Sequence, residues 1–162
     1  MKMQWILIIV VAVVIAAGGM FTGCSGGKKT QWQNAEPGTI LVDYYTGIFG
    51  TDGYDSHYEL VLKKTEAADT VLLEEYEGDA KGERCTQYTV PIEAVEKCYE
   101  IIDGNRLHTW NKKYKEYPLE GGSTVCRFYD GEKQVRVTTD CMPQDGAKIL
   151  HEIGQVMQSY QQ

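Results

Sequence analysis

The sequence predicts an α+β domain in which an antiparallel sheet of about six strands carries two helices on one face, in the order β-β-β-β-α-β-β-α. Two observations support this fold class. Apolar residues first alternate with a period of two along successive segments, and they later recur at helical spacing. Strands that follow one another through short loops pair antiparallel, which leaves the helices to cover one face of the sheet.

The first half of the folded part predicts four strands. Three of them show alternation between the two faces of a strand. In the first strand, Ile40, Val42 and Tyr44 alternate with Leu41, Asp43 and Tyr45, and in the second, Tyr58, Leu60 and Leu62 alternate with Glu59, Val61 and Lys63. In the third strand, Val71 and Leu73 alternate with Leu72, Glu74 and Tyr76. Residues 84–90 form the fourth strand because they are rich in β-formers. Residues 64–69 between the second and third strands predict a hairpin loop.

A change of period at Pro91 predicts the first helix. Its apolar positions recur at helical spacing and are Ile92, Val95, Tyr99 and Ile102. The helix should end at Asp103-Gly104, because glycine adopts the positive φ that often closes a helix. Residues 111–117 are polar and predict a loop.

The remaining elements are a hairpin and a second helix. Residues 125–129 and 134–139 flank Asp130-Gly131, a pair suited to a type I′ turn. The last helix should begin at Pro143 or Asp145. Its apolar stripe consists of Leu150, Ile153, Met157 and Tyr160.

The first residues have the organisation of an export signal. Lys2 precedes an apolar run from Trp5 to Ala17, which has the length of a signal-peptide core and is shorter than a membrane-spanning helix. Small residues then flank Cys24. An apolar stretch extended through Phe21 is nearly long enough for an uncleaved anchor, which remains the alternative.

This arrangement, Phe21-Thr22-Gly23-Cys24, resembles the lipobox of bacterial lipoproteins, although Phe21 stands where leucine is commonest. The resemblance implies cleavage before Cys24 and attachment of a diacylglycerol anchor of the palmitate type to the Cys24 thiol. It places the protein on the extracytoplasmic face of the cell membrane. In a general way the rest of the chain resembles uncharacterised small extracellular domains of Gram-positive lipoproteins, and no functional residue is carried over from that likeness.

The chain therefore divides into three parts. Residues 1–23 are the signal peptide, residues 24–37 are the lipidated cysteine with a flexible tether, and residues 38–162 are a single α+β domain. Within the tether, Trp32 is expected to be half-exposed, and packing back on the domain or contact with the membrane interface is the alternative. Processing removes Lys2, so 15 basic against 23 acidic residues leave a net charge of about −8, which anionic lipid head groups repel. An acidic chain also argues against a general nucleic-acid binder.

Four of the five cysteines remain after Cys24 is assigned to the lipid. An even number in an oxidising compartment suggests two disulfides, for which there are three pairings. Cys98 with Cys126 would join a helix to the sheet and leave Cys85 with Cys141. Free buried cysteines are the alternative. The sequence has no C-x-x-C motif that would indicate redox catalysis.

No other motif indicates catalysis, a metal or a cofactor. The histidines, at positions 57, 108 and 151, lack metal-ligand spacing. The acidic loop around Asp52 lacks the calcium-loop order, and Ser123 lacks the nucleophile-elbow pattern. Gly121-Gly122 is not followed by the lysine of a phosphate-binding loop. We therefore expect a protein without enzymatic activity, metal site or cofactor.

Tyrosine is the unusual residue, with 11 copies in the chain. Tyr44, Tyr58 and Tyr76 lie on predicted strands, and tyrosines along a sheet can form a recognition surface. The simpler interpretation is that tyrosine is a strong β-former. We expect the binding surface on the sheet face opposite the helices.

The expected function is that of a membrane-anchored lipoprotein whose domain binds a protein, peptide or envelope component without catalysis. Two alternatives stay open. One is an accessory or structural subunit of an envelope complex. The other is an extracytoplasmic hydrolase that uses carboxylates, because acidic residues are plentiful although no pair stands out.

Overall fold

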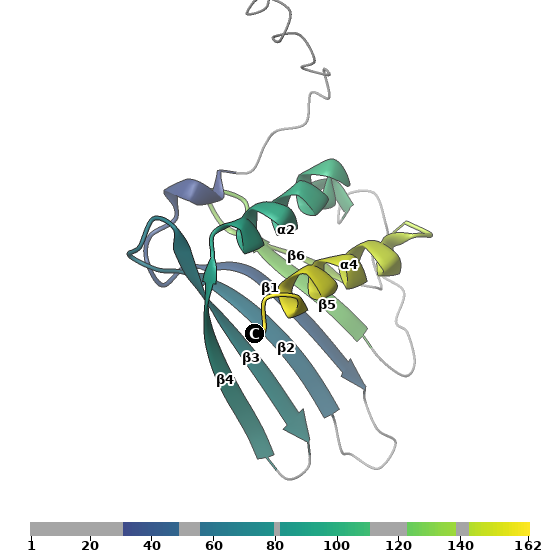
Figure 1. Ribbon diagram of the computed structural model, residues 1–162. Helices are drawn as coiled ribbons and strands as arrows, with labels where there is room; N and C mark the ends of the chain where they lie inside the picture. The colour runs from purple at the N-terminus through teal and green to yellow at the C-terminus, as the bar shows by residue number, and fades with distance from the viewer. Residues whose placement is uncertain (1–30, 49–55, 80–81, 111–122, 139–142) are drawn as a thin grey trace, which may run out of the picture.

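The computed structural model describes residues 31–48, 56–79, 82–110, 123–138 and 143–162. These residues form one six-stranded antiparallel sheet with the strand order β4-β3-β2-β1-β5-β6 (Figure 1). The strands are β1 (Ile40–Ile48), β2 (Ser56–Lys64), β3 (Thr70–Asp79), β4 (Gly82–Pro91), β5 (Ser123–Tyr129) and β6 (Gln134–Thr138). The predicted α+β class is confirmed. The predicted signal peptide, Cys24 and the loop at 111–117 lie outside the described residues.

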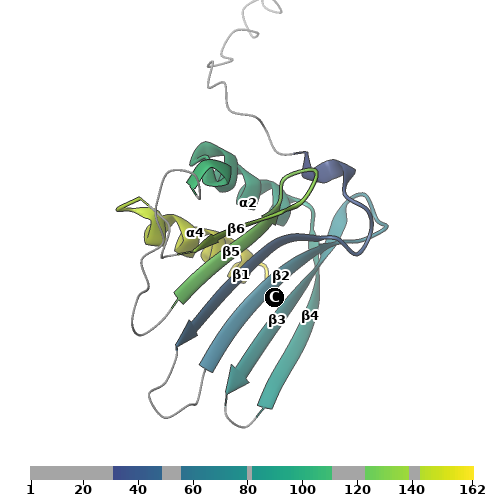
Figure 2. The ribbon, with the colours of Figure 1, turned by 180° about the vertical axis from the view of Figure 1, so that it is seen from behind.

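Two α-helices in the described part, α2 (Glu93–Gly104) and α4 (Gly146–Gln158), lie on the same face of the sheet. Figure 2 shows the sheet from behind, with no helix in front of it. Each helix buries one apolar stripe, as its spacing predicts, and the buried stripes include Val95, Cys98, Ile102, Leu150, Ile153 and Met157. The short 3₁₀ turns η1 (Trp32–Asn34) and η2 (Leu107–Thr109) complete the elements.

One close contact shows which side of β1 faces the helices. A Cβ added at Gly154 of α4 would lie 2.7 Å from ring atoms of Tyr44, so the tyrosine ring packs directly on the helix backbone. Tyr44 is 5% exposed and belongs to the core. Because successive side chains of a strand alternate, Asp43 and Tyr45 point to the helix-free face.

Trp32 lies in the core, contrary to the expectation of a half-exposed tether residue. It is 4% exposed, and its ring stacks on Tyr99 of α2 with 5.6 Å between the ring centroids. Lys64 Nζ lies 6.0 Å from the centroid of the indole ring. Burial of a large aromatic surface accounts for this placement. Packing on the domain therefore begins at η1, before the boundary at residue 38.

The hairpin between β5 and β6 also differs from the sequence prediction. Tyr129 pairs with Gln134, so the connection has four residues and is not a two-residue type I′ turn. The Asp130 side chain determines this loop, because its Oδ1 accepts hydrogen bonds from the backbone N–H groups of Glu132 and Lys133, each at 3.0 Å. Gly131 adopts a φ of 101°, which suits glycine.

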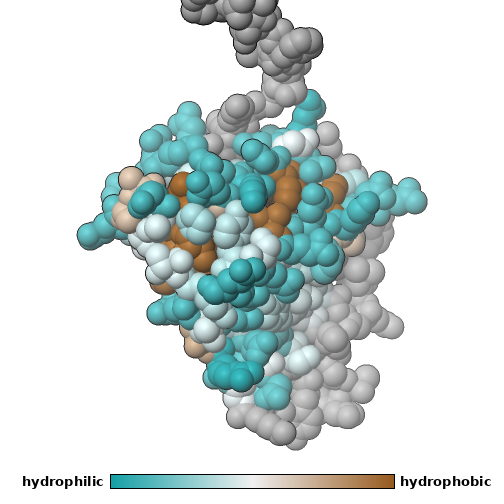
Figure 3. Space-filling view, in the orientation of Figure 1, coloured by the Kyte–Doolittle hydropathy of each residue, from teal (hydrophilic) through white to brown (hydrophobic). Residues whose placement is uncertain are grey.

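The surface of the helix layer is mostly hydrophilic, with apolar areas between polar ones (Figure 3). Ile40 is the one large hydrophobic side chain that is exposed among the residues the structure describes. None of the helices in that part of the chain is long and apolar enough to span a membrane.

Tyr99 joins the helix layer to the sheet, and its removal should weaken the fold. Its hydroxyl lies 2.9 Å from the Leu41 carbonyl oxygen and 2.7 Å from that of Tyr129. Tyr99→Phe should lower the free energy of unfolding by about 1–3 kcal/mol, because a buried carbonyl then lacks its donor. Urea denaturation measures this loss. Tyr160→Phe, at a half-exposed position just after α4, is the matched control and should change little; an equal loss in both variants would refute the role of Tyr99.

Candidate functional site

The helix-free face brings together polar side chains from five strands. Strand pairing determines their order, because residues directly opposite each other lie on the same face. Asp43 is opposite Arg127 of β5 and opposite Val61 of β2. On the far side, Glu74 of β3 stands between Val61 and Gln87 of β4. One row of side chains thus crosses the sheet from β5 to β4.

These side chains surround a hollow of about 390 Å³ on that face. Its lining residues are Ile40, Asp43, Glu59, Val61, Lys63, Glu74, Tyr76, Arg127 and Gln134. Val61 separates two polar clusters, one around Asp43 and one around Glu74. A second hollow of about 380 Å³, at the end of the β3–β4 hairpin, has no buried residue in its lining. We therefore place the candidate site in the central hollow.

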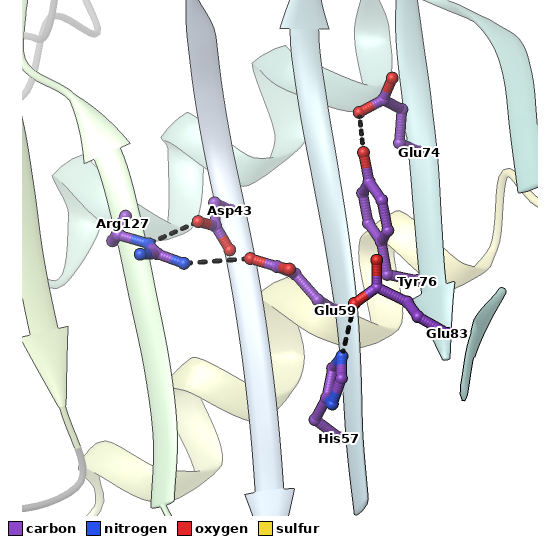
Figure 4. A network of polar contacts seen from close by, with 7 residues as sticks. All are labelled: Asp43, His57, Glu59, Glu74, Tyr76, Glu83 and Arg127. Carbon is purple, nitrogen blue, oxygen red and sulfur yellow. Dashed lines mark hydrogen bonds and ion pairs between the residues drawn. The ribbon is translucent and has the colours of Figure 1, made fainter. Parts of the chain in front are cut away.

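The first cluster is built around Asp43, which is 3% exposed. Arg127 Nε donates a hydrogen bond to Asp43 Oδ2 at 2.5 Å, and Arg127 Nη2 donates to Glu59 Oε1 at 3.0 Å. Figure 4 shows all three side chains pointing toward one another from β5, β1 and β2. The guanidinium therefore bridges two carboxyl groups on adjacent strands.

Asp43 has one oxygen without a donor. Its Oδ1 is fully buried and has no hydrogen-bond partner. Burial, together with the charge of Glu59, raises the pKa of Asp43 from an ordinary value of 3.8 to about 6, against the opposing effect of Arg127. When both groups are ionised, Asp43 and Glu59 are both acceptors and cannot bond to each other. A single proton on the pair supplies the missing hydrogen bond.

The second cluster satisfies its carboxylate completely. Glu74 is 5% exposed and accepts hydrogen bonds from Lys63 Nζ at 2.5 Å, the Tyr76 hydroxyl at 2.7 Å and Gln87 Nε2 at 2.9 Å. Burial alone would raise the pKa of Glu74, but these donors outweigh it and lower the pKa. The hydrogen bond to Glu74 in turn raises the pKa of Tyr76. The hollow thus holds one satisfied and one unsatisfied buried carboxyl group.

Beyond the hollow, the same face carries an aromatic pair. The rings of Tyr45 and His57 stack with 5.8 Å between their centroids, and His57 Nε2 lies 3.3 Å from Glu83 Oε2. His57 approaches Gly78 so closely that a Cβ there would lie 2.1 Å from the imidazole ring. A side chain at position 78 would therefore displace His57.

The three predicted tyrosines do not share one surface. Tyr76 lines the hollow on the helix-free face. Tyr44 packs under α4 in the core, and Tyr58 lies on the helix side, where its hydroxyl donates to Glu75 at 2.8 Å and approaches Gln161 near the chain end. We expected the binding surface on the sheet face that holds the hollow, but two of the three tyrosines, Tyr44 and Tyr58, lie on the opposite face.

The described cysteines are free thiols, so the expected bridge between Cys98 and Cys126 is not formed in this structure. Both are fully buried, and burial raises the pKa of each thiol, to about 12 for Cys98. They behave as small apolar core residues, which was the alternative. Cys85 is exposed on β4. Its expected partner Cys141 lies outside the described residues.

Sequence reasoning did not select Asp43, Glu59, Lys63, Glu74 and Arg127 as a site. The alternation already assigned Asp43, Glu59 and Glu74 to the faces opposite the most apolar ones. The available signal was that polar residues alternate with the apolar residues that face the core. The sequence does not show the strand register that places these polar residues beside one another.

In the described part of the chain, no group of three His, Cys, Asp or Glu side chains is arranged to hold a metal ion. No protein-family model matches the chain, and a search of curated proteins found no match. The arrangement of the residues themselves therefore carries the functional argument.

The raised pKa of Asp43 predicts a stability effect that depends on pH. An acid whose pKa is higher in the folded state binds its proton more tightly there, so stability falls as pH rises from 3.8 to about 6. Asp43→Asn removes this titration. The variant should match the wild type near pH 4 and exceed its free energy of unfolding above pH 6, by at most about 3 kcal/mol. Urea denaturation across this pH range measures the difference.

Glu74→Gln is the matched comparison for this measurement, because folding lowers the pKa of Glu74. That variant should be less stable than the wild type at pH 7, with the difference shrinking as pH falls through the pKa values of Glu74. A loss of stability in Asp43→Asn above pH 6 would show that Asp43 is not an unsatisfied carboxylate.

Proposed function

We propose that this chain is a lipid-anchored extracytoplasmic protein whose helix-free sheet face binds a protein, peptide or envelope component. The anchor is assigned to Cys24, from the resemblance of residues 21–24 to a lipobox. The binding surface is assigned to the hollow around Asp43, on the face that the helices leave open.

A single observation carries the binding role. Asp43 is buried on a sheet face that no helix covers, and one of its oxygens lacks a partner. Burial of a polar atom without a hydrogen bond costs free energy, so the unpartnered oxygen of Asp43 destabilises the fold. Unsatisfied and titration-shifted groups in a hollow are characteristic of functional sites.

The same carboxyl pair supports a second candidate, an extracytoplasmic hydrolase. Asp43 would supply an acid with a raised pKa beside a second carboxyl group, Glu59, and general acid catalysis uses an acid with a raised pKa. Hydrolysis of an envelope polymer that is lost in Glu59→Gln would favour the second candidate.

The anchor is tested by the intact mass of the membrane-extracted protein. We expect a chain that begins at Cys24 and carries acyl chains. Cys24→Ala should stay unprocessed and should lack the lipid mass. Retention of Met1 in the wild type, or processing at Gly23 together with membrane attachment in the variant, would contradict the assignment.

The binding face is tested by photo-crosslinking in intact cells. A photoreactive residue at Thr89, exposed on the helix-free face of β4, should give a discrete adduct. The matched control is Gln155, exposed on α4 in the helix layer, which should give none. Arg127→Ala should abolish the Thr89 adduct because it removes the bridge between Asp43 and Glu59. Equal adducts from both positions, or no effect of Arg127→Ala, would refute the assigned surface.

A further inference from the structure

One buried acceptor in the hollow lacks a donor. Arg127 Nε and Nη2 donate to Asp43 and Glu59, and Lys63 Nζ donates to Glu74. Asp43 Oδ1, in contrast, has no donor. A ligand that completes the hydrogen bonding of Asp43 must therefore bring a donor.

The charge of the hollow leads to the same conclusion. Its lining contains three carboxyl groups, Asp43, Glu59 and Glu74, and two cationic groups, Lys63 and Arg127. With all of them ionised, one negative charge is uncompensated. A neutral hydroxyl donor would leave this charge in place, whereas a cation would neutralise it in a partly desolvated site.

The floor of the hollow is apolar. Val61 is 4% exposed between the two clusters, and Ile40, at 36%, is exposed at the edge. A short aliphatic stem can pack on these side chains while its charged end reaches the carboxyl pair. The combination of an apolar floor and an acidic end fits an ammonium on an alkyl chain better than it fits a bare metal ion.

We propose that the hollow binds an aliphatic primary amine. Its ammonium group donates to the part-exposed Glu59 carboxyl group and, once the Glu59 side chain moves aside, to Asp43 Oδ1, which has no exposed surface before binding. The ammonium replaces the proton that the pair otherwise shares. The inference rests on the proposed function, because it names the ligand chemistry of the same face. A primary ammonium brings three donors and one positive charge, so it can donate to Asp43 Oδ1 and offset the one uncompensated negative charge of the lining. The amine can belong to a lysine side chain of a peptide or to a free diamine.

Exchange of a proton for a cation makes binding depend on pH. The charged and titratable groups that face Asp43 are Glu59 and Lys63 of β2, Arg127 of β5, and Glu74 and Tyr76 of β3. Among them Glu74 keeps its own donors and a lowered pKa, so Asp43 is the group that holds the proton. Because the proton competes with the ligand, affinity should be about tenfold lower at pH 5 than at pH 8.

Isothermal titration calorimetry of the full chain in detergent micelles tests the proposal. Cadaverine represents the free diamine and Nα-acetyl-lysine methylamide represents the peptide side chain, so the two arms distinguish the sources. At least one should bind, more weakly at pH 5 than at pH 8. Titrations at pH 6 in phosphate and in HEPES, whose ionisation enthalpies differ, should reveal release of a fraction of a proton.

One control distinguishes the contribution of the ammonium group from that of the aliphatic stem. The variants distinguish binding in the hollow from binding elsewhere on the acidic surface. Nα-acetyl-norleucine methylamide, which lacks the ammonium, should not bind. Asp43→Asn should weaken binding at least tenfold, at about the value of a charge-assisted hydrogen bond, whereas Glu66→Gln in the exposed β2–β3 turn should have no effect. If Asp43→Asn does not fold by circular dichroism, Glu59→Gln replaces it with the same expectation.

The failures can be told apart. If neither amine binds while the Thr89 adduct forms and depends on Arg127, the ammonium inference is overturned and the binding face stands. If norleucine binds as well as lysine, or if Asp43→Asn binds unchanged, the ammonium inference also fails. If neither amine binds and the Thr89 adduct does not form, the proposed function is refuted together with the ammonium inference.

Discussion

The pairing of β1 with β5 on one side and with β2 on the other is the constraint on which the site depends. It sets Arg127 opposite Asp43 and brings Glu59 within reach of the same guanidinium. A shift of one residue in either pairing would turn these side chains toward the helices and would place apolar side chains in the hollow. The contact between Tyr44 and Gly154 opposes such a shift, since it holds the other face of β1 against α4. Core packing and site geometry are therefore two consequences of one register.

The fold could be predicted from the sequence, but the site could not. Period-two alternation and helical spacing are local patterns, and they gave the strands, the helices and the antiparallel order. The grouping of Tyr44 and Tyr58 with Tyr76 was wrong because alternation shows which residues share a face of a strand without showing which face the helices cover. Trp32 was misjudged for a related reason, since its partner Tyr99 lies far away in sequence. The contact between Asp43 and Arg127 joins residues 84 positions apart, and no local pattern reports it.

The two buried carboxyl groups of the hollow have different roles, because Glu74 stabilises the sheet and Asp43 is the centre of the proposed binding. Glu74, with three donors, strengthens the connection between β2, β3 and β4. Asp43 keeps an oxygen without a donor in the same hollow, at a cost to the folded state that a ligand or a proton can relieve. This difference explains why the proposed binding centres on Asp43. A folded domain can accept such a cost because the core beneath the helices, with Trp32 and Tyr99 in it, supplies stability from the opposite face.

The central claim is that Asp43 holds a proton because it is buried beside a second carboxyl group, Glu59. The most direct measurement is a ¹³C NMR titration of the Asp43 carboxyl carbon in the chain without ligand. We predict a midpoint near pH 6 for Asp43, because its burial and the neighbouring charge of Glu59 raise its pKa. A midpoint for Asp43 at or below its ordinary value of 3.8 would contradict the account. It would show that donors already satisfy both oxygens and that the hollow offers no acceptor to a ligand.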